Sequence, residues 1–142
     1  MKVSARNVFK GTVIAVRPGA VNAQVEIELG QGDQLISVVT QESVTALELA
    51  PGKEVLAIVK APWVMLMSDG SDLRLSARNQ LVGVVKHIEP GAVNSEVTLT
   101  LPGGTEVTSV VTREAVAELG LTVGGSATAV IKASNVILGV TA

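Results

Sequence analysis

Hydrophobic and polar residues alternate over short stretches in the first half of the chain. The clearest stretches are NVFKGTVIAV at 7–16, VNAQVEIEL at 21–29, QLISVVT at 34–40 and EVLAIVK at 54–60. Alternation with a period of two predicts strands with one buried face, and the turn-forming segments RPGA, GQGD and APGK separate them. WVMLM at 63–67 adds a fifth apolar stretch. The pattern therefore predicts five short strands, which are enough for a small barrel.

One segment between the third and fourth expected strands has helical character. In TQESVTALEL, Thr40 is suited to cap a helix N-terminus and Glu42 falls in the first turn. Val44 and Leu47 form an apolar pair three residues apart. A five-stranded barrel with one short helix between strands three and four has the layout of the OB fold. We therefore expect a mainly β protein built from OB-like barrels.

The second half of the chain repeats the first. Ser4 aligns with Ser76, an offset of 72 residues (76 − 4), and the match runs from 4–67 to 76–139 without a gap. About two residues in five are identical along this match. The repeat predicts two tandem five-stranded OB-like domains, at 1–67 and 76–142, with a linker at 68–75. Each copy has about 65 residues, which is near the lower limit for an independent core, so we expect packing between copies or between chains.

Composition narrows the possible functions. Apolar residues make up 47% of the chain, but there is only one Phe, one Trp and no Tyr. The absence of Cys and the single His87 argue against a thiol nucleophile, a His cluster and an enzyme in general. No apolar run reaches the roughly 18 residues that cross a bilayer, and MKVSARNVF lacks the apolar core of a signal peptide. These features predict a cytoplasmic protein without a membrane partner.

A few cations were kept in both copies while most charges changed. Arg6 matches Arg78 and Lys60 matches Lys132, whereas Arg17 faces a glutamate in the second copy. Exposed charges contribute little to stability and change freely, so the retained cations need a reason. One possibility is structural: ion pairs, or aliphatic stems that cover the ends of a barrel. The other is an oxyanion site, in which the two cations act with neutral donors from the same segments.

The repeated motifs closely resemble those of a known family. SARN at 4–7, PGAVN at 18–22, the strand end that bears Thr40, and KAPW at 60–63 occur together and in tandem. In this combination the chain is similar to the molbindins, tandem-repeat molybdate-binding proteins built from Mop or TOBE domains. The resemblance covers essentially the whole chain. It implies a homotrimer of OB-like domains that stores or buffers molybdate or tungstate in the cytoplasm, without catalysis.

The resemblance also implies two types of molybdate site. The interface type comprises Ser4, Ala5, Arg6, Asn7, Thr40, Ser43, Lys60 and Ala61 from the first copy, and Ser76, Ala77, Arg78, Asn79, Thr112, Lys132 and Ala133 from the second. The axial type comprises Gly19, Ala20, Val21 and Asn22 with Gly91, Ala92, Val93 and Asn94. The second copy departs from the first in two places, because Ala115 stands opposite Ser43 and KASN replaces KAPW. We therefore expect the two interface pockets to differ in affinity.

Nucleic-acid binding is the alternative function, because OB-like barrels often have it. That mode of binding relies on aromatic platforms along a basic groove. This chain has only two aromatic residues and a net charge of −2. No nucleic-acid partner is therefore expected.

Overall fold

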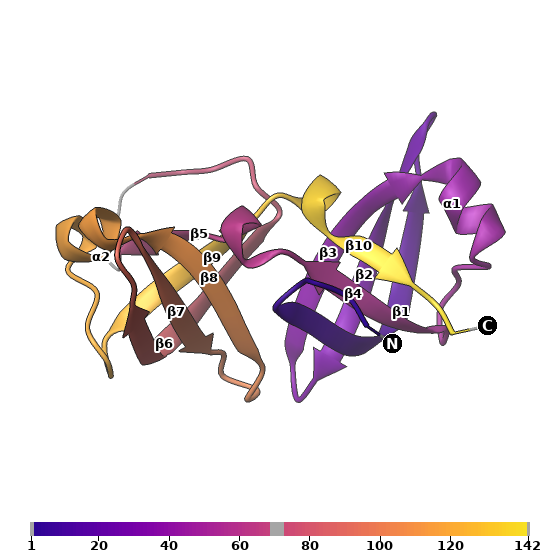
Figure 1. Ribbon diagram of the computed structural model, residues 1–142. Coiled ribbons are helices and arrows are strands. Elements are labelled where there is room, and N and C mark those ends of the chain that lie inside the picture. The colour runs from indigo at the N-terminus through magenta and orange to yellow at the C-terminus, as the bar shows by residue number, and fades with distance from the viewer. Residues whose placement is uncertain (1, 69–72, 142) are drawn as a thin grey trace.

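The computed structural model describes residues 2–68 and 73–141 (Figure 1). The central part of the expected linker, 69–72, lies outside the described residues. The first repeat contributes strands β1 (Asn7–Pro18), β2 (Asn22–Gly30), β3 (Asp33–Thr40), β4 (Glu54–Val59) and β5 (Met65–Ser68). The second repeat contributes β6 (Asn79–Pro90), β7 (Asn94–Thr100), β8 (Glu106–Thr112), β9 (Ser126–Ile131) and β10 (Ile137–Gly139). The prediction of a mainly β fold with five strands per repeat is confirmed.

A short helix lies between the third and fourth strands of each repeat, as expected. These helices are α1 (Gln41–Ala46) and α2 (Arg113–Leu119), and the threonine before each one accepts a hydrogen bond from the first turn. Two 3₁₀ turns, η1 (Ala61–Trp63) and η2 (Ala133–Asn135), precede the last strand of each repeat. In the described part of the chain, no helix is long and apolar enough to cross a membrane.

The two antiparallel sheets exchange their last strands. Their strand orders are β10-β4-β1-β2-β3 and β5-β9-β6-β7-β8, so each sheet takes its fifth strand from the other repeat. Leu138 pairs with Ala57, and Leu66 pairs with Ala129. In Figure 1, β10 (yellow) accordingly lies against the first barrel and β5 lies in the second. Because β10 also contacts β3, and β5 contacts β8, each sheet curls toward closure in the OB-like layout.

The exchange differs from the simplest expectation, in which each copy would complete its own barrel. After β4 the chain passes through η1 and crosses to the other repeat, where Val64 is buried against β8. The Ser109 hydroxyl donates a hydrogen bond to the carbonyl of Val64, and the Ser37 hydroxyl donates to the carbonyl of Val136 in the reciprocal crossing. These crossings join the two repeats into one folding unit.

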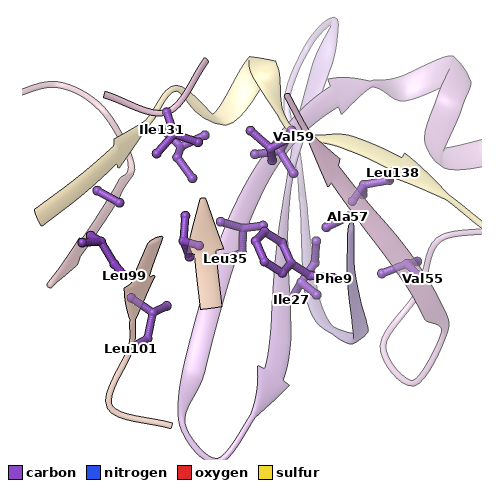
Figure 2. Close-up of a cluster of buried hydrophobic side chains, with 14 of the residues drawn as sticks. Phe9, Ile27, Leu35, Val55, Ala57, Val59, Leu99, Leu101, Ile131 and Leu138 are labelled. Atoms are coloured by element: carbon purple, nitrogen blue, oxygen red, sulfur yellow. The ribbon is translucent and has the colours of Figure 1, made fainter. Parts of the chain in front are cut away.

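A single apolar core extends through both barrels. Phe9, Ile27 and Leu35 belong to the first repeat, Leu99 and Ile131 belong to the second, and all five are in one buried cluster. Figure 2 shows this cluster, including Leu138 of β10 close to Ala57 of β4. The shared core explains how two repeats of such small size bury enough apolar surface to fold.

One buried carboxylate links the repeats in addition to the exchanged strands. Asp33 is only 6% exposed, and its two oxygens accept hydrogen bonds from the backbone N–H groups of Gly103 (2.9 Å) and Thr105 (3.1 Å). Burial by itself raises the pKa of Asp33, but the hydrogen bonds from Thr105 and Gly103 outweigh that effect, so its pKa lies below the usual 3.8. The ionised form is therefore the stabilising one.

We expect Asp33→Asn to lower the free energy of unfolding at pH 7 by about 1–3 kcal/mol, because two hydrogen bonds to a charge are weakened. A group whose pKa is depressed in the folded state stabilises the fold above its unfolded pKa. That contribution is lost as the pH falls from about 3.8 through the lower folded value. Urea unfolding of both proteins at pH 7 and pH 3 should therefore show a smaller difference at pH 3, and an equal difference at both would contradict this role.

Candidate functional site

The asparagines of the two SARN motifs face the opposite repeat. The side-chain amide of Asn7 donates to the carbonyl of Thr108 (2.7 Å), and its oxygen accepts from the Thr108 N–H (2.7 Å). Asn79 makes the same pair of hydrogen bonds, both 2.7 Å, with the backbone of Ile36. Each asparagine is only 2% exposed. Their side chains therefore join the repeats, while the neighbouring Ser and Arg face outward.

The motifs that contain the retained cations of the second repeat meet in one hollow. Its volume is about 460 Å³. The residues that line it are Val38, Met65, Leu75, Ser76, Ala77, Arg78, Val130, Lys132, Ala133 and Ser134. Arg78 and Lys132, 54 residues apart in sequence (132 − 78), thus lie around the same space. The expected association of SAR with the lysine that follows β9 is present in the structure.

This hollow, which we call the Arg78 pocket, contains donors, and among the described residues no carboxylate lines it. Two cations and two serines line it, and its remaining residues are apolar. Within residues 2–68 and 73–141, neither Arg78 nor Lys132 forms an ion pair. Both side chains are exposed, so an anion could reach them from solvent.

The N-terminal end of α1 lies next to the Arg78 pocket. A second hollow of about 300 Å³ is lined by Thr40, Ser43, Asn22 and Ser134, together with Val38, Val39, Leu47, Val136, Ile137 and Leu138. The two hollows share Val38 and Ser134, so they are neighbours. Thr40 and Ser43 of the first repeat therefore lie beside the KAS segment of the second repeat.

The hydroxyl groups of Thr40 and Ser43 interact with each other. The Thr40 hydroxyl donates to the Ser43 oxygen (2.9 Å) and accepts from the Ser43 N–H (3.0 Å). In the second repeat the Thr112 hydroxyl accepts from the Ala115 N–H (3.0 Å), with no hydroxyl at position 115 to match Ser43. The turn after Lys60, η1, contacts β8, and the turn after Lys132, η2, contacts β3, so each lysine precedes a turn that lies against the other repeat.

The corresponding cations of the first repeat have other partners. Arg6 donates to a carboxylate oxygen of Glu96 at 2.6 Å. The Lys60 Nζ lies 5.9 Å from the centre of the Trp63 ring, within range of a cation–π contact. The structural interpretation of the retained arginine thus describes Arg6, but it does not describe Arg78. The hollow beside Arg6, about 340 Å³, is lined by Lys10 and Glu106 among others, and its lining includes neither Ser4 nor Lys60. We use the name Arg6 pocket for the site expected at Ser4, Arg6 and Lys60, the counterparts of Ser76, Arg78 and Lys132.

The two GAVN segments form matching turns. Gly19 N–H donates to the carbonyl of Asn22, and Gly91 N–H donates to that of Asn94, both at 2.8 Å. Each turn presents a valine, Val21 or Val93, that is 72% exposed. Ala20 and Ala92 are also exposed beside them. The expected axial residues therefore sit on the surface, at the tips of the β1–β2 and β6–β7 hairpins.

Sequence reasoning missed Ser134 and Glu96. Ser134 was hidden because its counterpart is Pro62, so the repeat comparison showed no shared donor there. Glu96 has no acidic counterpart in the first repeat, where Gln24 stands at the same place, so a search for charges shared by both copies does not select it. The difference between Glu96 and Gln24 could have indicated that the two retained arginines have different partners.

Comparison with known proteins identifies the repeats. The family model described as "TOBE domain" matches residues 3–66 and again residues 75–138. The chain belongs to the TOBE-domain family. The predicted resemblance to tandem Mop/TOBE proteins is thereby confirmed, since the two matches cover most of the chain.

Several relatives of this TOBE-domain chain are known. It is 50% identical over 140 residues to the molybdenum transport protein ModE of Azotobacter vinelandii, covering 99% of this chain and 52% of that protein. It is 46% identical over 138 residues to the molybdenum-pterin-binding protein MopA of Rhodobacter capsulatus, covering 97% and 52%. The chain thus spans about half the length of these curated relatives. A crystal structure of the cytoplasmic molybdate-binding protein ModG, with molybdate bound, is 71% identical, with a TM-score of 0.94 and coverage of 99% and 100%.

Proposed function

We propose that this chain is a cytoplasmic binding protein that holds molybdate, or tungstate, for storage and homeostasis, without catalysis. The observation that supports this most strongly is the Arg78 pocket, where two cations and two hydroxyl groups surround one space that no carboxylate of residues 2–68 and 73–141 lines. The similarity over nearly full length to ModG, crystallised with molybdate bound, supports the choice of anion.

The lining of the Arg78 pocket suits a tetrahedral dianion. Such an anion only accepts hydrogen bonds at neutral pH, so it needs donors and is repelled by carboxylates. Arg78 offers a planar fork of N–H groups, while Lys132 offers a compact positive charge. Ser76 and Ser134 add neutral hydroxyl donors. The backbone N–H of Ala133 belongs to the proposed set, because the first N–H groups of a 3₁₀ turn have no partner within the turn. The backbone N–H of Ala77, which lies in the SAR segment before β6 and also lines the pocket, completes the set.

We assign the Arg6 pocket the same function in the first repeat. Ser4, Arg6 and Lys60, with backbone N–H groups near Ala5 and Ala61, would hold the anion there. Thr40 and Ser43 line the hollow next to the Arg78 pocket. We assign Thr112 to the surroundings of the Arg6 pocket because it is the counterpart of Thr40. In this proposal the side chains of Asn7 and Asn79 position the motifs and make no contact with the anion.

We further propose that the chain assembles as a homotrimer with axial sites. Val21 and Val93 are each 72% exposed, and Val82, Val84, Met65 and Ile137 are also exposed by half or more, so apolar surface is available for contact between chains. In a trimer, the Ala20–Asn22 and Ala92–Asn94 segments of three chains would gather around the axis and hold further anions. Native mass spectrometry with molybdenum analysis would give the number of chains and anions together.

A thermal-melt assay tests the class of ligand. A ligand present at 100 times its dissociation constant stabilises the fold by about 2.7 kcal/mol, so molybdate and tungstate should each raise the melting temperature clearly. Sulfate should raise it less, and single-stranded DNA should leave it unchanged. A shift with DNA alone that disappears at high salt would overturn the proposal in favour of nucleic-acid binding.

A further inference from the structure

Glu96 is a carboxylate that bonds to Arg6 and has a neutral counterpart in the first repeat. Glu96 on β7 pairs with Arg6 at 2.6 Å, and the equivalent residue on β2 of the first repeat is Gln24. Gln24 pairs in register with Val38, which lines the Arg78 pocket. By the correspondence of the repeats, position 24 near the Arg78 pocket is equivalent to position 96 beside Arg6, but it holds a neutral amide where position 96 holds an acid.

We infer that Glu96 lowers the oxyanion affinity of the Arg6 pocket by competing for the guanidinium, so that the Arg78 pocket fills first. This inference rests on the proposed function, because both pockets are taken to hold the same anion. The Arg6 guanidinium must break its hydrogen bond to the Glu96 carboxylate before all its N–H groups can donate to a bound anion. The carboxylate that it leaves would also repel a dianion nearby.

The ion pair between Arg6 and Glu96 is weak. Glu96 therefore competes with the anion for Arg6 without preventing the anion from binding. The side chains are 61% and 31% exposed, and exposed ion pairs contribute about 0.2–1 kcal/mol. Such a pair exchanges with other partners at low cost. Glu96 therefore reduces affinity in a graded way and leaves the Arg6 pocket able to bind at higher anion concentration.

The neighbouring strand strengthens the hold of Glu96 on Arg6. Glu89 pairs in register with Glu96 across β6 and β7, and like charges directly opposite each other are destabilising. The positive charge of Arg6 reduces the repulsion between Glu89 and Glu96, and this further favours the ion pair between Arg6 and Glu96. In the first repeat the corresponding pair is Arg17 and Gln24, which carries no repulsion between like charges. Arg78 therefore has no such repulsion to offset.

Two other contacts favour the same order of filling. Lys60 lies over Trp63, whereas Asn135 occupies the matching place after Lys132. Ser43 has a hydroxyl group near the Arg78 pocket, whereas its counterpart in the second repeat, Ala115, has none. The first difference leaves Lys132 with one competing partner fewer than Lys60 has. The second difference gives the Arg78 pocket one more neutral donor nearby.

The test is Glu96→Gln, which gives both pockets the amide that the Arg78 pocket already has. In calorimetric titration with molybdate, the unmodified protein should show a tighter and a weaker class of interface site. The substitution should tighten the weaker class by roughly threefold to tenfold, corresponding to loss of a surface ion pair and of one nearby negative charge, and leave the tighter class unchanged. An unchanged weaker class would overturn the inference.

The reciprocal variant and a matched control sharpen this test. Gln24→Glu should weaken the tighter class by a similar factor, because it places a carboxylate near Arg78. Glu54→Gln removes the same charge at the far end of β4, about 20 Å from Lys60 along the strand, and should change neither class. If Glu54→Gln matched Glu96→Gln, net charge and not the Arg6 contact would explain the effect, and the inference would be wrong.

A further variant ties the effect to Arg6. In an Arg6→Ala background, Glu96→Gln should change the affinity by less than it does in the unmodified protein, because there is no guanidinium left to release. An undiminished effect would remove Arg6 from the explanation. Failure of the proposed function itself would look different, since the unmodified protein would then bind no molybdate at all.

Discussion

Replacement of Arg78 by alanine is expected to weaken molybdate binding at the tighter interface pocket by about tenfold to a hundredfold. Hydrogen bonds to charged groups contribute about 1.5–3 kcal/mol, and 1.4 kcal/mol is a factor of ten in affinity. Arg78 lines the pocket and has no carboxylate partner in residues 2–68 and 73–141, so its guanidinium is available to the anion. Calorimetric titration measures the loss directly.

Two further variants give this expectation its controls. Arg6→Ala should have a smaller effect on its own pocket, because Glu96 already holds part of that guanidinium's interaction in the free protein. Lys53→Ala removes a cation from the turn before β4, outside both pockets, and should leave the affinity unchanged. If Arg78→Ala bound molybdate as tightly as Lys53→Ala, Arg78 would not be part of the site.

The second large effect concerns stability. Asn79→Ala is expected to lower the free energy of unfolding by about 2–4 kcal/mol, because two buried hydrogen bonds disappear and the N–H and carbonyl of Ile36 lose their partners. Asn7→Ala should do the same through Thr108. The measurement is urea unfolding of ligand-free protein at fixed protein concentration, since both ligand and assembly shift apparent stability.

Gln80→Ala is the matched control for the asparagine variants. Its amide is exposed and, among the described residues, bonds to the nearby carbonyls of Leu75 and Ala77, which belong to the same repeat. We expect a loss below about 1 kcal/mol. If Asn79→Ala were as mild as this control, the asparagine would not be a link between the repeats, and its assignment to the anion site would regain support.

The strands and helix starts could be predicted from the sequence because they depend on local patterns. Alternation along 34–40 places Leu35 and Ser37 on the buried face, and both are buried. Thr40 and Thr112 cap their helices as their position suggested. The identity of the retained cations could also be found, since a tandem repeat lets one copy serve as a comparison for the other.

The exchange of the last strands could not be predicted in the same way. Both repeats carry the same apolar pattern, so β4 would meet similar neighbours whether it paired with β5 or with β10. Ile58 faces Ile137 in the structure and would face the equivalent Met65 in an unexchanged barrel. Alternation fixes which face of a strand is buried, but it does not say which of two similar strands lies beside it.

The different roles of Ser, Arg and Asn within SARN could not be predicted either, because they depend on contacts with residues far away in the sequence. Ser, Arg and Asn are all reasonable donors to an anion, and nothing local separates them. The partners of Asn7 lie 101 residues away, at Thr108, and the partner of Arg6 lies 90 residues away, at Glu96. Only the folded chain shows that the asparagine joins the repeats and that one arginine has a competing carboxylate.

The most direct test of the central claim is a crystal structure of this chain grown with molybdate and measured at the molybdenum absorption edge. We predict an anomalous peak in the Arg78 pocket, within hydrogen-bond distance of the Arg78 guanidinium and the Lys132 ammonium group, and a weaker peak in the Arg6 pocket. Anomalous peaks only at other places, with both pockets empty at saturating molybdate, would contradict the account.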